Sequence, residues 1–398
     1  MKGFKREKYI KKILPFIDKN LIKVIVGQRR VGKSHFMFQI MEYIKEQNKK
    51  ATIIYINKED LVFDSIRNYK DLVEYAVKQK GKNKKAYIFI DEIQEIEGFE
   101  KALRHFQTKE EWDIYCTGSN AELLSGELAT GLSGRYIELE IYSLSYKEFL
   151  QFHKLKDKQE SFEKFIKFGG LPYLYNLELK EYIIYDYLKN IYSAILFKDI
   201  VARFNIRNVS FLERLTHFVA DNIGQLVTAK SITKFLKAQN IKFTNTTVLD
   251  YLSYLTNAFF IFSVKRNDLK GKRILEIGEK YYFGDVGIRN ALTGYKKNDI
   301  SQVLENIVFL HFKINKFDVK IGKIGDKEID FVCKKNGKTI YIQVTLSLVD
   351  KKVQEREIGN LLLIKDNYLK IVITADEYHN EEIEGVEIWN IRKFLMEF

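Results

Sequence analysis

The sequence predicts an α/β protein built on a parallel sheet, and three observations support this fold class. Between residues 21 and 140, short apolar runs alternate with stretches of helical periodicity. A glycine-rich loop carrying a lysine and a serine follows the first apolar run. From about residue 279, a second alternation of strand and helix patterns begins. Continuous apolar strands separated by helices are typical of parallel sheets that helices cover on both faces.

The first alternation predicts five strands and the helices between them. The strands are expected at residues 21–26, 51–56, 86–90, 112–117 and 136–141. Helices are expected among others at residues 34–47 and 99–108, where apolar side chains recur with helical spacing. A first domain is therefore expected over residues 1–142.

The rest of the chain predicts three further modules. Residues 143–224 have mostly helical patterns and are expected to form a helical lid, and residues 225–278 hold two short helices followed by strands. Residues 279–398 are expected to form a smaller α/β domain. Its predicted strands are 281–284, 327–333, 339–345 and 370–374, and its predicted helices are 302–315, 353–363 and 390–398.

Composition excludes several classes of protein. The 398 residues allow two to four domains, and 46% hydrophobic residues suffice for packed cores. Two cysteines, Cys116 and Cys333, cannot form a disulfide framework or a four-thiolate zinc site. No apolar run is long enough to span a bilayer, and the basic start lacks the apolar stretch of a signal peptide. We therefore expect a cytoplasmic protein with no membrane partner.

The charge balance is basic and leaves two interpretations open. Lys and Arg number 66 against 53 Asp and Glu, a formal net charge of +13. Such a balance suits polyanionic partners such as DNA. Abundant Lys, Ile, Asn and Tyr are also typical of an AT-rich genome, so the charge alone does not separate the two interpretations.

Residues 27–34 match the pattern G-x-x-x-x-G-K-[ST] at every required position. Gly27 and Gly32 permit backbone angles that a side chain forbids, so the loop can turn its N–H groups toward phosphate oxygens. Lys33 supplies a charge for the β and γ phosphates, and the Ser34 hydroxyl is a hard ligand for Mg²⁺. The expected nucleotide-binding residues are Gly27, Gln28, Arg29, Arg30, Val31, Gly32, Lys33, Ser34 and His35.

Two carboxylates end the strand expected at residues 86–90. Asp91 is placed to hold Mg²⁺ together with Ser34, and Glu92 is placed to activate the attacking water as a general base. The alternative is an acidic helix start that the helix dipole favours. With a phosphate-binding loop ahead of it, the pair predicts hydrolysis and not binding alone.

Further candidates follow the next two strand positions. Thr117, Ser119 and Asn120 come after the strand at residues 112–117, where a polar group would face the γ-phosphate. Ser119 and Asn120 are also suited to cap a helix expected at residues 121–125. Arg135 precedes the fifth strand and is a catalytic candidate if it reaches the nucleotide of a neighbouring subunit, which requires an oligomer.

These motifs together resemble the AAA+ type of P-loop ATPase. GQRRVGKS at residues 27–34, YIFIDEIQEI at 87–96 and CTGSNAELLSG at 116–126 are similar to those of a prokaryotic group related to archaeal ATPases and signalling NTPases. FGGLPY at 168–173 resembles that group's Gly-x-Pro element. The resemblance implies a five-stranded parallel sheet with the phosphate-loop strand central, followed by a helical lid. Residues 282–289, 304–306, 328–332 and 341–344 resemble the group's C-terminal half.

The middle module has the pattern of a winged helix. Helices at residues 228–236 and 245–255 precede strands at 259–264 and 272–277. In a DNA-binding winged helix the second helix enters the major groove and the wing lies near phosphates. The residues placed for these contacts are Thr244, Asn245, Thr246 and Thr247 on the helix, and Lys265, Arg266, Lys270, Lys272 and Arg273 on the wing. A purely structural module is the alternative.

The spacing of Glu305, Asp330 and Gln343 in the last domain resembles the restriction-endonuclease-like fold. In that fold a helix Glu, a strand Asp and an E-x-K sequence hold metal for phosphodiester cleavage. Here Gln343 replaces the acid and Thr345 replaces the lysine, with Lys338 or Lys351 as substitutes. We therefore expect a second metal site at Glu305 and Asp330 to be degenerate, and nuclease activity to be absent.

The sequence leaves three functional hypotheses. The first is an Mg²⁺-dependent ATPase that couples ATP binding and hydrolysis to DNA or to a protein partner. The second is an ATP-regulated, metal-dependent nuclease. The third is a slow nucleotide switch of the signalling type that holds ATP or ADP.

Overall fold

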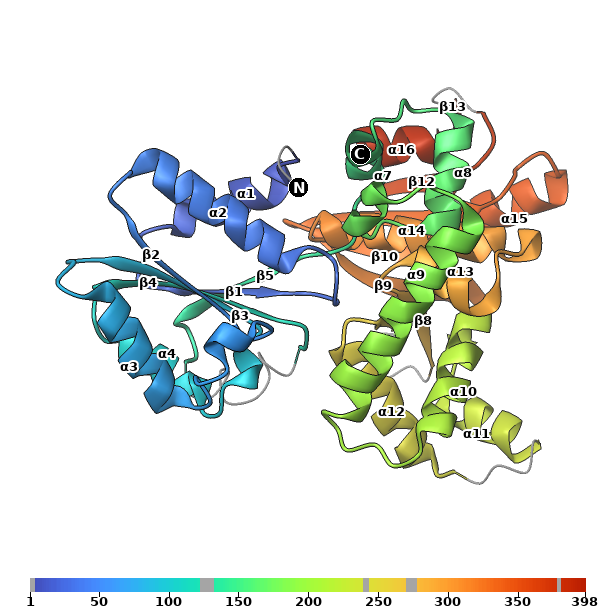
Figure 1. The fold of residues 1–398 in the computed structure, drawn as a ribbon. Helices are drawn as coiled ribbons and strands as arrows, with labels where there is room; N and C mark the ends of the chain where they lie inside the picture. Colours follow the sequence, from blue (N-terminus) through green and yellow to red (C-terminus); the bar gives the residue numbers. More distant parts are fainter. Residues whose placement is uncertain (1–3, 122–131, 239–242, 270–277, 378–380) are drawn as a thin grey trace. The chain divides into compact units, whose positions relative to one another are not determined.

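The computed structural model describes residues 4–121, 132–238, 243–269, 278–377 and 381–398 (Figure 1). The chain divides into two compact units. The first comprises residues Met1–Tyr142 with Asn257–Phe259, and the second comprises Ser143–Thr256 with Phe260–Phe398. The first unit thus ends its main segment at Tyr142, where the first domain was expected to end.

The first unit contains a five-stranded sheet in the order β2-β3-β4-β1-β5, with every neighbouring pair parallel. All five predicted strands are confirmed to within a residue or two at their ends. They are β1 (Ile22–Val26), β2 (Thr52–Asn57), β3 (Ala86–Asp91), β4 (Trp112–Gly118) and β5 (Tyr136–Glu140). Strands β1, β3 and β4 are buried along their whole length, as their unbroken apolar runs require.

The position expected for β1 needs one correction. The strand lies between β4 and β5, so it is second from an edge and not the middle strand of five. The chain leaves β1, crosses to the far edge at β2 and returns through β3 and β4, and only β5 is added on the other side. The phosphate loop still follows an interior strand.

Helices cover both faces of this sheet (Figure 1). One face carries α1 (Glu7–Ile13) and α2 (Lys33–Gln47), and the other carries α3 (Tyr69–Lys80) and α4 (Phe99–Gln107). Short 3₁₀ turns lie at η1 (Leu14–Phe16), η2 (Leu61–Phe63) and η3 (Ile93–Glu95). Helix α3 begins with a capping box, in which Asn68 and Asp71 each accept from the other's backbone N–H.

The second unit opens with helices, as expected. They are α7 (Tyr146–His153), α8 (Gln159–Phe168), η4 (Pro172–Asn176), α9 (Glu181–Ala194), the π-helical turn η5 (Ile195–Val201), α10 (Val209–Asp221), α11 (Ala229–Ala238) and α12 (Asn245–Asn257). Later helices are α13 (Val286–Thr293), η6 (Lys297–Asp299), α14 (Ile300–Ile314), α15 (Lys351–Leu362) and α16 (Ile391–Glu397).

A nine-stranded mixed sheet forms the rest of the second unit, in the order β13-β14-β12-β11-β10-β9-β7-β8-β6. Its strands are β6 (Leu226–Val227), β7 (Ile261–Asp268), β8 (Glu279–Phe283), β9 (Asp318–Ile324), β10 (Lys327–Lys335), β11 (Lys338–Thr345), β12 (Leu369–Thr374), β13 (Glu381–Ile383) and β14 (Val386–Asn390). Strand β11 pairs antiparallel with β10 and parallel with β12. Helix α15 connects β11 to β12, which is the connection that parallel neighbours need.

Pairing at β7 and β8 differs from the expected wing. The strand expected at residues 272–277 lies outside the described residues. The antiparallel partner of β7 is β8, from Ile261 opposite Phe283 to Lys265 opposite Glu279. Strand β7 also pairs parallel with β9 through Arg266–Asp268. The strands of the expected middle and terminal modules therefore hydrogen-bond to each other across the division expected between residues 278 and 279.

The described residues also bear on membranes and cysteines. Within these ranges, no helix combines the length and apolar character needed to cross a bilayer. Cys116 and Cys333 are both buried and free, on β4 and β10. Burial raises the pKa of the Cys116 thiol to about 12 and holds the thiol protonated.

Candidate functional site

The glycine-rich loop lies between the carboxyl end of β1 and the first turn of α2. Gly27 has φ +144°, and a Cβ built there would lie 2.1 Å from the carbonyl oxygen of Ile141. Gly32 has φ +97° and Arg30 φ +70°, so the loop turns twice through the left-handed region. These backbone angles explain why glycine is needed at both ends of the loop.

Lys33 closes the loop on itself. Its Nζ donates to the carbonyl oxygens of Gly27 (2.9 Å) and Gln28 (3.1 Å) and lies 3.9 Å from Glu92 Oε1. The Lys33 side chain is buried, and the Gln28 side chain is buried with it. Among the described residues, neither amide atom of Gln28 has a hydrogen-bond partner. The loop thus presents a buried ammonium and a buried amide close to each other in sequence.

Thr117 bonds the Asp91 carboxylate and the backbone of Glu92, the two acids that the sequence selected. Its hydroxyl donates to Asp91 Oδ1 and accepts from the backbone N–H of Glu92 at 3.0 Å. The other oxygen, Asp91 Oδ2, accepts from the Tyr55 hydroxyl at 3.1 Å. Thr117 was one of three candidates for facing the γ-phosphate, and its hydroxyl bonds Asp91 and Glu92 in the structure. Tyr55 was missed, because strand periodicity does not tell which polar tip will meet an acid on the next strand.

Glu92 is held in an unusual backbone conformation beside Lys33. Its φ of +53° lies in the left-handed region, which is uncommon for residues other than glycine. Burial alone raises its pKa, but the Lys33 ammonium and the Gln94 amide outweigh burial, and the pKa is lowered from its ordinary value. Glu92 is therefore ionised at neutral pH, as a general base must be before it accepts a proton.

The remaining candidates near the loop lie where the sequence placed them in the chain. Ser119 and Asn120 follow β4 directly, and both side chains are buried. Residues 122–125 of the helix that they were expected to cap, at residues 121–125, lie outside the described residues. Ser34 and His35 are half-buried in the first turn of α2, and burial lowers the pKa of His35.

Arg135 lies at the amino ends of the strands, whereas the phosphate loop lies at their carboxyl ends. Its carbonyl oxygen accepts from Ile22 N at 3.0 Å, and Tyr136 pairs with Ile22 at the amino end of β1. The loop leaves the carboxyl end of the same strand, about 13 Å away at strand rise. The side chain is exposed, and the expected role of Arg135 on a neighbouring subunit stays a prediction.

Arg6 braces the loop from outside the motif. Its Nη1 donates to the carbonyl oxygens of Val31 (3.3 Å) and Tyr142 (2.8 Å), and the side chain is buried. The guanidinium also lies over the Tyr9 ring, 4.5 Å from its centroid. A single arginine thus ties the phosphate loop to the segment after β5. No sequence motif marked this residue.

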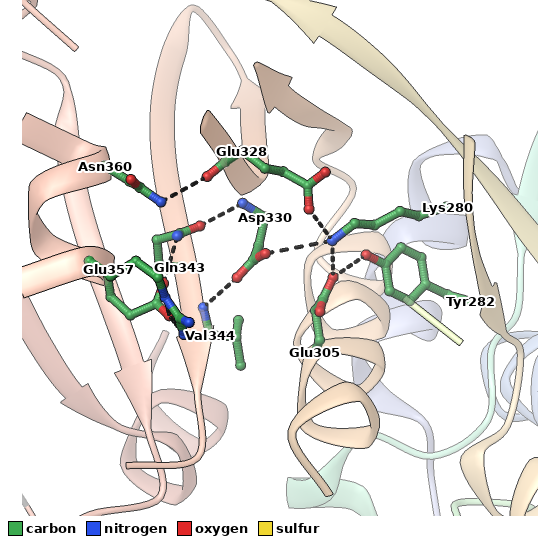
Figure 2. A network of polar contacts seen from close by, with 10 residues as sticks. Lys280, Tyr282, Glu305, Glu328, Asp330, Gln343, Val344, Glu357 and Asn360 are labelled. Atoms are coloured by element: carbon green, nitrogen blue, oxygen red, sulfur yellow. Dashed lines mark hydrogen bonds and ion pairs between the residues drawn. The ribbon is translucent and has the colours of Figure 1, made fainter. Parts of the chain in front are cut away.

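Glu305 and Asp330 come together in the second unit, around a lysine that the sequence did not single out (Figure 2). Lys280 of β8 places Nζ 2.8 Å from Glu305 Oε1, 2.8 Å from Glu328 Oε1 and 3.6 Å from Asp330 Oδ1. The Tyr282 hydroxyl donates to the same Glu305 oxygen. The lysine beside these acids is therefore neither Lys338 nor Lys351, which are both exposed at the starts of β11 and α15.

Gln343 takes part in the same network (Figure 2). Its Oε1 accepts from Asp330 N at 2.7 Å, and its Nε2 donates to Glu357 Oε2 at 2.7 Å. Thr345 is buried at the end of β11 and donates to the Ser347 carbonyl at 3.4 Å. Asn306, next to Glu305, bonds both backbone groups of Phe283, at 2.7 and 3.0 Å.

The residues expected to read DNA bases are engaged within their own module. Thr244 Oγ1 accepts from Thr247 N at 3.1 Å, and the Thr233 hydroxyl donates to Asn245 Oδ1. These contacts cap α12, which buries Val248, Leu252 and Leu255. Exposed cations lie instead on α11, at Lys230, Lys234 and Lys237. Of the expected wing residues, Lys265 and Arg266 lie on β7, and Lys270, Lys272 and Arg273 lie outside the described residues.

Two family models match separate parts of the chain. A model described as an AAA domain matches residues 19–150, which covers the sheet and the phosphate loop. A model described as a domain of unknown function matches residues 159–299, which covers the helices after the first unit and the strands β6 to β8. The first match agrees with the resemblance carried by residues 27–34 and 87–96.

The chain is also similar to whole proteins along most of its length. An uncharacterised protein of Haemophilus influenzae is 36% identical over 98% of both chains. An uncharacterised protein of Methanocaldococcus jannaschii is 32% identical over 90% of this chain and 83% of its own length. Among solved structures, the Aeropyrum pernix Orc1 protein in complex with DNA is similar at 13% identity, covering 72% of this chain and 91% of that one, with a TM-score of 0.33.

The parallel sheet, the glycine-rich loop and these matches agree with one another. This chain belongs to the AAA+ type of P-loop ATPases, in the same family as these Haemophilus and Methanocaldococcus proteins.

Proposed function

We propose that the first unit binds ATP with Mg²⁺ and hydrolyses it, and that its nucleotide state controls how the second unit holds DNA. One observation carries the proposal. Thr117 bonds Asp91 and Glu92 together, and Glu92 lies 3.9 Å from the Lys33 ammonium of the phosphate loop. A phosphate-binding cation, a metal-binding acid and a base are thereby held in one place.

The loop is suited to phosphate because one of its buried donors is bonded by carbonyl oxygens of the loop itself and another has no partner among the described residues. Lys33 Nζ donates to two carbonyl oxygens of its own loop, which phosphate oxygens can replace. The buried Gln28 amide has no partner among the described residues, so a ligand or water must satisfy it. Gly27 has no room for a Cβ because the Ile141 backbone lies against it, so a larger residue there would displace the loop.

Ser34 and Asp91 are the residues proposed to hold Mg²⁺. Both offer oxygen atoms, the ligands that Mg²⁺ prefers, and Asp91 is fixed from both sides by Thr117 and Tyr55. When bound, Mg²⁺ neutralises charge on the β and γ phosphates.

Glu92 is proposed to take the proton of the attacking water. The Thr117 hydroxyl fixes the Glu92 backbone, and Gln94 donates to Oε2, so Oε1 is the oxygen that faces Lys33. Ser119 and Asn120, buried at the end of β4, are proposed to sense the γ-phosphate. Arg135 is proposed to act only on a neighbouring subunit, because it lies at the amino end of β5, beside the amino end of β1, whereas the phosphate loop leaves the carboxyl end of β1.

The basic face of α11 favours DNA as the partner. Lys230, Lys234 and Lys237 recur at helical spacing and are all exposed. Within the described ranges, none of the three forms an ion pair or a hydrogen bond through its side chain. Unpaired ammonium groups along one helix face match the repeating charge of a phosphate backbone.

Steady-state ATP hydrolysis in Mg²⁺, measured with and without duplex and single-stranded DNA, tests the proposal. We expect Lys33→Ala to abolish nucleotide binding, and Lys230→Ala/Lys234→Ala to remove stimulation by DNA at unchanged basal rate. Lys351→Ala/Lys352→Ala, which removes two exposed lysines from α15, is the matched control. Slow hydrolysis with retained nucleotide and no DNA response would instead indicate a switch that acts on a protein partner.

A further inference from the structure

The acidic centre of the second unit already contains a cation, and that cation belongs to the protein. Lys280 reaches from β8 to Glu305 on α14 and to Glu328 and Asp330 on β10 (Figure 2). Only 4% of the Lys280 side chain is exposed. An ammonium this buried requires charged partners, because burial without them is strongly unfavourable.

Several of the carboxylate oxygens that a metal ion would bind already have partners within the protein. Glu305 Oε1 accepts from both Lys280 Nζ and the Tyr282 hydroxyl. Asp330 Oδ2 accepts from Val344 N at 2.8 Å, while Asp330 Oδ1 faces the ammonium. A divalent ion bound to Glu305 and Asp330 would therefore have to displace either the ammonium or these donors.

The neutral residue beside these acids, Gln343, also has both of its amide atoms bonded within the protein. Gln343 stands where the nuclease resemblance expects an acid, and it bonds Asp330 N and Glu357 at once. Its carbonyl oxygen points to a backbone N–H and is not free for metal. Over the described ranges, no group of three or more His, Cys, Asp and Glu side chains is arranged to hold a metal ion. The residues present thus do not fit the metal that the resemblance implies.

We propose that the Lys280 ammonium occupies the place of the divalent cation in this centre, so that the centre binds no divalent ion while Lys280 is present. Removing the ammonium leaves three carboxylates from two elements facing one another. Without the ammonium these carboxylates repel one another, and a divalent cation such as Mg²⁺ or Mn²⁺, which prefers oxygen ligands, would relieve that repulsion. A Lys280→Met chain is therefore expected to gain a divalent-ion site that the natural chain lacks.

This proposal is independent of ATP hydrolysis and concerns only the second unit. It also gives Glu305 and Asp330 a structural role that needs no nuclease chemistry. The two acids hold β8 against α14 and β10 through one shared ammonium. Their role is to join elements from the middle and terminal parts of one sheet, and this role needs no ion from solution.

Mn²⁺ binding to the full chain, without nucleotide, tests the proposal by electron paramagnetic resonance and by thermal unfolding. We expect Lys280→Met to bind one Mn²⁺ ion, to unfold at a lower temperature than the natural chain, and to be restabilised by Mn²⁺. The double variant Lys280→Met/Glu305→Gln should lose this ion. Lys265→Met, at an exposed lysine on the neighbouring strand, should behave as the natural chain does.

Two results would overturn the proposal. One is Mn²⁺ bound by the natural chain and lost in Glu305→Gln, or metal-dependent DNA cleavage lost in Asp330→Ala, since either places a metal beside Lys280. The other is a Lys280→Met chain that neither binds Mn²⁺ nor is stabilised by it, whether or not this variant folds in the absence of Mn²⁺. The first measurement uses the natural protein and does not depend on folding of the lysine variant.

Discussion

Replacing Glu92 by glutamine separates nucleotide binding from hydrolysis. The substitution keeps the size of the side chain and an oxygen that can accept from the Gln94 amide. It removes the negative charge and the oxygen that would accept the proton. A positioned general base contributes roughly 10²- to 10⁴-fold to rate. We therefore expect kcat for ATP to fall by that factor, which corresponds to about 3–5.5 kcal/mol in the barrier.

Binding of ATP should survive the same substitution. Glu92 and Lys33 lie 3.9 Å apart, and at an effective dielectric of about 20 their attraction is about 4 kcal/mol. The neutral amide of the Glu92→Gln variant would release the ammonium from this attraction, so Lys33 becomes more available to phosphate. The dissociation constant for ATP should therefore stay the same or fall, because the substitution also removes a negative charge from the phosphate site.

Single-turnover hydrolysis and equilibrium binding of a fluorescent ATP analogue measure the two quantities separately. Glu95→Gln is the matched control, since Glu95 lies on the same 3₁₀ turn with an exposed side chain. Unchanged turnover in purified Glu92→Gln protein would refute the assignment of Glu92 as the base. Loss of ATP binding in this variant would refute the charge argument and indicate a structural role for the carboxylate.

Three further predictions concern backbone, core and pH. Gly27→Ala should weaken ATP binding at least roughly tenfold, about 1.4 kcal/mol, because its Cβ would lie 2.1 Å from the Ile141 oxygen; titration calorimetry measures it. Asp113→Ala leaves the fully buried Lys23 ammonium without its carboxylate and should destabilise the first unit by about 3–5 kcal/mol in urea unfolding, whereas an apolar replacement of both residues should recover much of the loss. Burial, together with the nearby Glu305, raises the pKa of Asp330 to about 7, so the folded state binds a proton that the unfolded state releases above about pH 4. Stability of the second unit should then fall as pH rises from about 4 through 7; Asp330→Asn should flatten this part of the profile, and an unchanged slope would contradict the assignment.

The first sheet was predictable because its signals are local. Unbroken apolar runs mark strands buried on both faces, and all five strands lie where these runs lie. The order of the strands in the sheet was harder to predict from the sequence, because it depends on crossover connections that span dozens of residues. For the same reason β1 was expected in the middle, while the sheet adds only β5 beyond it.

The site residues were predictable where they belong to a motif of adjacent residues in the sequence. The loop at Lys33 and the acids at Asp91 and Glu92 are motifs of contiguous sequence. Partners that arrive from distant elements carry no such mark, so Tyr55, Arg6 and Lys280 were found only in the folded chain. Lys280 stands 25 residues before Glu305 and 50 before Asp330. The pairing of β8 with β7, of β7 with β9 and of β9 with β10 connects the strands of Lys280 and Asp330, and Glu305 comes from α14.

The continuity of the nine-stranded sheet has a consequence for anyone who cuts this protein into fragments. A fragment that ends near residue 278 would leave β7 without its antiparallel partner β8 and its parallel partner β9. Both sides of β7 would then show unpaired backbone N–H and C=O groups, which pair readily with other chains. Such a fragment is expected to aggregate, whereas one that begins at Ser143 and keeps the whole sheet has every neighbour of β7 in place.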